Sequence, residues 1–398
     1  MLVATALVLL MTPALAFFYG GLVRSKNALN TMMMSYISLG FVSVLWAVIG
    51  YSLAFSEGTN WLGDTSMAFL NGVGTAAKGT IPHMLFMAFQ ATFCIITAAL
   101  ISGAIVERMR FSAYVVFISL WSVVIYAPIA HWVWGGGWLA DMGALDFAGG
   151  TVVHVNAGVA ALVAAIVVGR RQDYGAASLV PHNVPFVLLG AGLLWFGWFG
   201  FNAGSALAAS PQAALAFVTT MLAPAATLVV WTLLDFFRLG KATAVGGGTA
   251  IVVGLVAITP AAGFVSPMNA LILGAIAAVP SYIALIVRAK TSLDDSLDVV
   301  AAHGVGGTVG ALLTGVFADK SLPGGLANGL MYGNPDQLRI QATAVLTAIV
   351  YSGVGTFILL KIIGLILPLR ATTEEQTVGL DVTQHGEEAY LHGGTMAG

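Results

Sequence analysis

The chain has 398 residues, of which 59% are hydrophobic and only 8% are charged, and its mean hydropathy is +0.93. No water-soluble domain could bury that much apolar surface, so the composition predicts a protein whose solvent is a lipid bilayer. A net charge of −2 offers no basic patch for nucleic acid, and the single cysteine, Cys94, excludes a disulfide framework and a cysteine metal cluster.

Eleven stretches are apolar over the roughly 20 residues that a transmembrane helix requires. They predict an all-α integral membrane protein with a transmembrane transport domain over residues 1–370 and a cytoplasmic C-terminal tail over 371–398. The predicted spans are 2–23, 31–56, 83–106, 112–132, 148–169, 183–203, 211–236, 243–265, 268–287, 297–318 and 340–368.

Basic residues predict the orientation of these spans. With the N-terminus outside and the C-terminus in the cytoplasm, 12 of the 15 basic residues lie on the cytoplasmic side, as the positive-inside rule requires. The 12 are Arg24, Lys26, Arg108, Arg110, Arg170, Arg171, Arg238, Lys241, Arg288, Lys290, Lys361 and Arg370, and the other three are Lys78, Lys320 and Arg339.

The first span resembles a secretory signal because its initial apolar stretch ends in Ala14-Leu15-Ala16, which is similar to a cleavage site. However, no basic residue precedes it, and Arg24 and Lys26 follow it. This charge distribution is expected for a transmembrane helix whose N-terminus lies outside. We expect this span to be retained, while its start at residue 1 leaves the true N-terminus open.

The fifth and tenth predicted spans carry matching residues. Asp146 precedes His154 by eight residues, Asp295 precedes His303 by eight residues, and the two copies are 149 residues apart. Because each unit holds an odd number of spans, the two copies run in opposite directions. This predicts an inverted repeat of spans 1–5 and 6–10.

The predicted depth of the two histidines suggests a role in transport. At 1.5 Å per helical residue, His154 lies about 12 Å from the outer end of its span, and His303 lies about 12 Å from the inner end of its own. Both then sit near the middle of the bilayer, where inverted-repeat transporters place their sites. A lone histidine there is more often a packing residue, but a symmetry-related pair favours function. Asp146 and Asp295 lie at span ends, so we expect them to cap helices as structural support.

Six segments along the chain resemble the sequence signatures of a known protein family. They are 17–24 (FFYGGLVR), 103–112 (GAIVERMRFS), 131–137 (HWVWGGG), 146–156 (DFAGGTVVHVN), 198–205 (WFGFNAGS) and 379–390 (GLDVTQHGEEAY). Each resembles a signature of the ammonium transporter family, within the Amt/Mep/Rh superfamily, and they follow the family's order. The compact layout and the last segment are similar to the bacterial Amt branch rather than to the Rh branch.

The resemblance implies an ammonium transporter in the bacterial inner membrane, assembled as a homotrimer with one pore per protomer. It also implies that the tail over 371–398 folds as a helix and turn against the cytoplasmic face, where a PII-type signalling protein binds. The acidic composition of the tail alone would instead predict a solvated, mobile segment. The resemblance implies no enzymatic activity, no cofactor, no metal and no nucleic-acid partner, only ammonium or ammonia and membrane lipid.

The resemblance also implies residue roles. Ammonium would bind at the outer mouth to Trp134, Phe93 and Ser205, with Phe89 beside them and Asp146 supporting this site from behind. A gate would be formed by Phe93 and Phe201. The pore beneath it would be lined by His154, His303 and Trp198. A desolvated cation gains up to about 2 kcal/mol against an aromatic face, and a serine oxygen can accept one of its N–H groups. From the residues alone, Trp132, Trp134 and Trp138 fit an interfacial aromatic belt equally well, and the two phenylalanines fit core packing.

The expected mechanism separates ammonia from its proton. Moving an intact cation past phenyl rings into an apolar pore costs several kcal/mol or more, whereas neutral ammonia forfeits only hydrogen bonds. Whether the proton stays outside or crosses along the histidine pair is open. Two alternatives are an enzyme with the histidines as haem or metal ligands, which their isolation on separate spans disfavours, and an ammonium sensor that signals in trans through a cytosolic partner.

Overall fold

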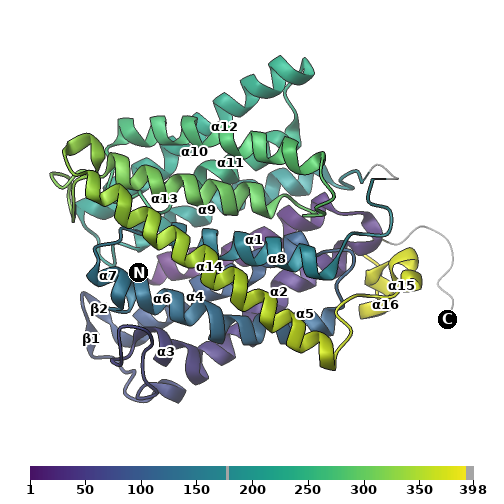
Figure 1. Cartoon of the computed structure of the whole chain (residues 1–398), viewed down its shortest axis with the longest axis horizontal. Helices are drawn as coiled ribbons and strands as arrows, with labels where there is room; N and C mark the ends of the chain where they lie inside the picture. The colour runs from purple at the N-terminus through teal and green to yellow at the C-terminus, as the bar shows by residue number, and fades with distance from the viewer. Residues whose placement is uncertain (176–178, 391–398) are drawn as a thin grey trace.

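The computed structural model describes residues 1–175 and 179–390, and most of the described chain is helical (Figure 1). The first half contains α1 (Leu2–Leu22), α2 (Ala28–Leu45), α3 (Tyr51–Phe55), α4 (His83–Ile101), α5 (Phe111–Trp121), α6 (Ala127–Trp134), α7 (Trp138–Asp141) and α8 (Asn156–Val168). The second half contains α9 (Val184–Gly204), α10 (Pro211–Leu239), α11 (Ala244–Ile258), α12 (Pro267–Ala289), α13 (Gly306–Phe317), α14 (Pro335–Ile366), α15 (Thr373–Val378) and α16 (Leu380–His385).

Short segments of other helical types join or extend these helices. The π-helical segments are η2 (Trp46–Gly50), η5 (Ser122–Tyr126), η6 (Gly150–Val155) and η7 (Val300–Val305), and the 3-10 segments are η1 (Ser25–Asn27), η3 (Ala68–Leu70), η4 (Ser102–Ala104) and η8 (Leu330–Tyr332). The segments η6 and η7 precede α8 and α13 and carry His154 and His303.

Ten helical stretches among the described residues are long and apolar enough to cross a membrane. They correspond to ten of the predicted spans. The remaining span, predicted over 243–265, contains α11, which has only 15 residues. This helix ends just before Pro260, which has no N–H group to continue it, and the chain passes into turns. The fold is therefore compatible with eleven spans, and the exact number stays a prediction.

The helices form two groups that pack along α1 and α9 (Figure 1). The helices α10 to α13 lie on one side of the bundle, while α4, α5 and α6 lie on the other. The long helix α14 crosses both groups obliquely and packs against α8 and α13. This arrangement brings η6 and η7 into contact at the interface between the two groups.

The two ends of the bundle differ. One end carries α7 and a hairpin of β1 (Ala77–Lys78) and β2 (Ile81–Pro82), which pair antiparallel, and we call it the hairpin end. The other carries α15 and α16, and we call it the tail end. The hairpin is not predicted by the sequence analysis, because strands of two residues are too short to show an alternating pattern.

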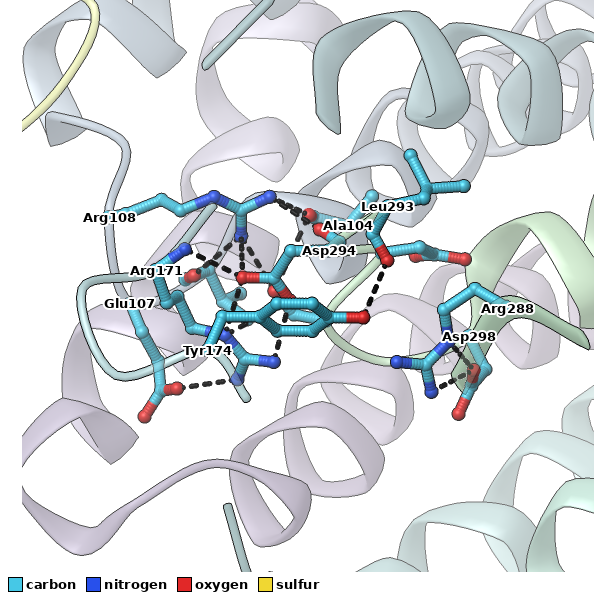
Figure 2. Close-up of polar contacts among 12 residues, drawn as sticks. Ala104, Glu107, Arg108, Arg171, Tyr174, Arg288, Leu293, Asp294 and Asp298 are labelled. Atoms are coloured by element: carbon cyan, nitrogen blue, oxygen red, sulfur yellow. Dashed lines mark hydrogen bonds and ion pairs between the residues drawn. The ribbon is translucent and has the colours of Figure 1, made fainter. Parts of the chain in front are cut away.

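A buried cluster of charges joins several loops at the tail end (Figure 2). Arg171 pairs with Glu107 at 2.7 Å and with Asp294 at 2.8 Å, and Figure 2 shows it between them. Arg24 pairs with Glu107 at 2.9 Å, and Arg108 donates to the Asp294 carbonyl at 2.6 Å. The ion pairs of these three arginines could not be predicted, because nothing in their spacing shows which carboxylates they meet.

The tail folds back onto the start of α2. The Asp381 carboxylate accepts the N–H groups of Leu29 at 3.0 Å and of Asn30 at 2.8 Å, so it caps that helix. The Asn27 side chain accepts the N–H of Leu380 at 2.8 Å and donates to Glu107 at 2.9 Å. Through residue 385 the tail is therefore folded rather than solvated, and residues 391–398 lie outside the described residues.

Candidate transport site

An aromatic cavity of about 280 Å³ opens at the hairpin end. Its lining residues, which define the aromatic cavity below, are Phe55, Phe86, Phe89, Gln90, Phe93, Val133, Trp134, Phe147, Ser205 and Leu207. The structure thus brings together Trp134, Phe93, Ser205 and Phe89, which are distant in the sequence. The ring of Phe93 lies 5.9 Å from that of Trp134, nearly perpendicular to it, and 4.9 Å from that of Phe89.

Asp146 fixes the position of Trp134 through its backbone. Its buried carboxylate accepts the N–H groups of residues 149 to 152 at 2.6 to 3.0 Å, which ties down the start of η6. Its carbonyl oxygen accepts the indole N–H of Trp134 at 2.8 Å. Asp295 holds the start of η7 in the same way, since its carboxylate accepts from Val299 at 3.1 Å and from Val300 at 2.7 Å. Neither aspartate lines the aromatic cavity.

A pair of closely packed, tilted rings lies at the inner end of the aromatic cavity. The rings of Phe93 and Phe201 have centroids 4.2 Å apart with an angle of 31° between their planes, and both are almost fully buried. Ser205 follows the last residue of α9, and its hydroxyl donates to the Phe201 carbonyl at 2.8 Å. The Ser205 oxygen therefore presents lone pairs, not its proton, to a ligand.

A second, much smaller cavity lies beyond the ring pair. It has room for about 10 Å³, close to the space of one water molecule. We call it the histidine cavity, and its lining residues are Met11, Leu15, Phe18, Ile96, Leu100, Val153, His154, Leu194, Trp198, Phe201, Val252 and His303. Apart from the two imidazoles and one indole, every lining side chain is apolar.

The two imidazoles in this cavity contact each other directly. Their Nδ1 atoms are 3.1 Å apart, and the His154 ring also stacks on Trp198 with 5.4 Å between centroids. A hydrogen bond between two Nδ1 atoms requires one protonated and one bare nitrogen. For two neutral rings, one Nε2 is then a donor and the other an acceptor. Among the residues that the structure describes, none is a hydrogen-bond partner of the buried Nε2 of His154.

Glycines on α8 and α13 allow this close approach. A Cβ on Gly307 would lie 2.9 Å from the Cβ of His154, and a Cβ on Gly158 would collide with the backbone of Gly304. The backbones of the two repeat copies therefore meet where side chains are absent. Gly158 and Gly307 occupy equivalent positions in the sequence repeat, 149 residues apart.

Some aromatic residues of the predicted belt stay outside both cavities. The indole N–H of Trp132 donates to the Trp61 carbonyl at 2.7 Å, and Trp138 packs on Trp61 with 5.5 Å between centroids. The geometry therefore distinguishes Trp134 from Trp132 and Trp138, whereas composition alone does not distinguish them. Gln90, which also lines the aromatic cavity, is missed by the sequence analysis although it is a polar residue inside an apolar span.

Helices of membrane-spanning length that enclose two cavities separated by a pair of aromatic rings are typical of a membrane transport protein. A family model described as Ammonium Transporter Family matches residues 1–390. The chain belongs to this ammonium transporter family, which is a family of transporters rather than of enzymes.

Individual relatives are similar over nearly the whole chain. An ammonium transporter of Bacillus subtilis is 49% identical over 96% of both chains, and one of Aquifex aeolicus is 50% identical over 98% of this chain and 92% of its own. Among solved structures, Saccharomyces cerevisiae Mep2 has 35% identity and a TM-score of 0.88, covering 94% of this chain and 86% of its own. A structure described as a sensor Amt protein has 32% identity and a TM-score of 0.89, covering 96% of both chains.

Proposed function

We propose that this protein binds ammonium in the aromatic cavity, where ammonium releases its proton to water, and conducts the neutral ammonia through the histidine cavity. The main support for the proposal is the order of the two cavities and of the ring pair that lies between them. Phe93 lines the first cavity, Phe201 lines the second, and their closely packed rings separate a cation-binding environment from a small, mostly apolar one.

Cation binding follows from the chemistry of the first cavity. The rings of Trp134 and Phe93 offer aromatic faces to a small cation, which gains up to about 2 kcal/mol there when it is desolvated. The Ser205 oxygen can accept one N–H of the ammonium, because its own proton is engaged with the Phe201 carbonyl. Phe89 completes the wall beside Phe93.

Passage of the neutral form follows from the chemistry of the second cavity. A space of about 10 Å³ lined by apolar side chains cannot hydrate a cation. The paired Nδ1 atoms of His154 and His303 leave one Nε2 donor and one Nε2 acceptor, which match the lone pair and the N–H groups of ammonia. Potassium carries no proton to release, so it is excluded.

The proposal extends to the assembly and its surroundings. The protein is a homotrimer with one pore per protomer in the bacterial inner membrane, with the hairpin end outside and the tail end in the cytoplasm. The folded tail, residues 371–390, is the regulatory element, and a PII-type protein binds beside it. The hydrogen bonds of Asp381 and Leu380 to the start of the second span support this role.

A sensor that signals in trans is the second candidate function. It is favoured by the likeness to the sensor Amt structure and by the bond path from Leu380 through Asn27 to the buried carboxylate of Glu107. Such a sensor would bind ammonium in the aromatic cavity without conducting ammonia at a useful rate.

Uptake by proteoliposomes tests the proposed function. After an ammonium pulse, wild-type protein should change the lumenal pH faster than empty liposomes do. Trp134→Leu should raise the half-saturating ammonium concentration about five- to thirtyfold, because a cation–π contact of about 1 to 2 kcal/mol is lost. Trp138→Leu is the matched control and should keep the wild-type value. Wild-type protein that binds ammonium without conducting it would support the sensor instead.

A further inference from the structure

The hairpin of β1 and β2 reaches across the rim of the aromatic cavity. On one side, Lys78 of β1 donates from Nζ to the carbonyl oxygen of Phe55 at 3.0 Å. On the other side, the Thr80 hydroxyl donates to the carbonyl oxygen of Leu207 at 2.7 Å. Phe55 and Leu207 are both lining residues of the cavity, so the hairpin is fastened to two of its walls.

The Lys78 ammonium group sits in a cage of three aromatic rings. Its Nζ lies 5.4 Å from the ring centroid of Tyr51, 5.8 Å from that of Phe55 and 5.1 Å from that of Phe86. The Tyr51 hydroxyl lies 3.3 Å from the same nitrogen and 2.6 Å from Nε2 of His83. Burial lowers the pKa of Lys78, while the ring faces and the oxygen acceptors all favour its charged form.

This charge is close to the cavity and is not neutralised by a carboxylate. Phe55 and Phe86, two walls of the Lys78 cage, also line the aromatic cavity. Among the salt bridges of residues 1–175 and 179–390, none includes Lys78. A fixed positive charge therefore stands behind the wall of a cavity that is proposed to bind a cation.

We propose that Lys78 is a positioning residue for transport, whose charge biases the aromatic cavity against ammonium and toward ammonia. A like charge disfavours the charged form of a neighbouring group. The field of Lys78 acts on ammonium but not on neutral ammonia, so it weakens cation binding and favours release of the ammonium proton to water. This inference rests on the proposed function.

Simple electrostatics gives the expected size of the effect. A cation against the far side of the Phe86 ring would lie about 10 Å from Nζ, roughly twice the distance from Nζ to that ring. At effective dielectric constants of about 20 to 80, two unit charges at about 10 Å change an equilibrium constant about two- to fifteenfold. The effect should shrink at high salt, because the Debye length falls from about 10 Å at 0.1 M to about 3 Å at 1 M.

The test compares Lys78→Met, which removes the charge, with Lys78→Arg, which keeps it. Half-saturating concentration and maximal rate are measured by ammonium uptake into proteoliposomes at low and high ionic strength. Lys78→Met should lower both quantities about two- to fifteenfold at low salt, with a smaller difference at high salt. Lys78→Arg should retain both wild-type values. Lys320→Met, which removes another lysine at the hairpin end, is the matched control and should also match wild type.

Two results would overturn the inference while leaving the proposed function intact. One is unchanged kinetics in Lys78→Met. The other is a raised half-saturating concentration in both Lys78 variants, which would show that the lysine only fastens the hairpin. Wild-type protein without any ammonium-dependent flux would instead overturn the proposed function, and this inference with it.

Discussion

At the scale of single residues, the buried carboxylate of Glu107 is stable as an anion because it meets several donors. Glu107 accepts from Arg24, Arg171 and Asn27, although its backbone has a left-handed φ of 66° that costs about 1 kcal/mol or more for a residue with a side chain. Burial would raise the pKa of Glu107, but the Arg171 and Arg24 charges outweigh it and lower the pKa to about 2. Removing one charge of this network should therefore lower the free energy of unfolding strongly.

Acid should destabilise the protein through Glu107. Its folded pKa of about 2 lies below the ordinary value of 4.5, so its contribution is complete above about pH 4.5 and is lost as the pH falls toward 2. The contribution is about 3 kcal/mol. Glu107→Gln should lower the thermal midpoint in detergent at pH 7 and flatten its decline between pH 5 and 3. Equal acid sensitivity in the variant and the wild type would refute this role.

The candidate residues of the aromatic cavity are predicted only through the family resemblance, whereas the two histidines also follow from the sequence repeat. Composition does not separate Trp134 from Trp132 or Trp138, since all three fit an interfacial belt. Only the fold shows that Trp134 turns toward the cavity, because its indole N–H bonds to the Asp146 carbonyl. The caging of Lys78 could not be predicted at all, because its partners lie in other segments and spacing carries no information about them.

At the scale of elements, the π-helical segments η6 and η7 place the histidines at the contact between the two halves. A π-helical turn shifts the side chains after it relative to a regular α-helix, and such turns often occur at functional sites. The glycines of α8 and α13 then let the two backbones approach. The repeat and the approximate depth of the histidines could be predicted, but the Nδ1 contact and the π-helical turns depend on packing that periodicity does not describe.

Gly307→Ala should disturb the histidine pair. The added Cβ would lie 2.9 Å from the Cβ of His154, so the neighbouring segment must shift at a cost of about 1 to 3 kcal/mol. Maximal ammonium flux should fall, while the half-saturating concentration set by the aromatic cavity should change little. Gly192→Ala on α9, where a Cβ would meet no atom of the described residues within 4 Å, is the control. Wild-type flux in Gly307→Ala would show that the close approach is not required.

At the scale of the whole molecule, hydropathy predicts the membrane-spanning helices far better than it predicts the loops and the C-terminal tail. Spans need only a long apolar stretch, so ten of the predicted ones have counterparts in the helices. The loops and the tail depend on contacts between distant segments, such as those of Asp381 with the start of α2. Acidic composition alone would leave the tail solvated, whereas tertiary hydrogen bonds fold it.

The central claim is that ammonia crosses the membrane along the histidine pair after its proton is removed. Ammonium flux and potassium current, recorded together in proteoliposomes holding wild-type, His154→Ala or His303→Ala protein, test it most directly. Wild-type protein should conduct ammonia and exclude potassium. Each variant should lose about tenfold or more in ammonia flux, the effect of about 1.4 kcal/mol, or should admit potassium. Wild-type flux and selectivity in both variants would contradict the claim.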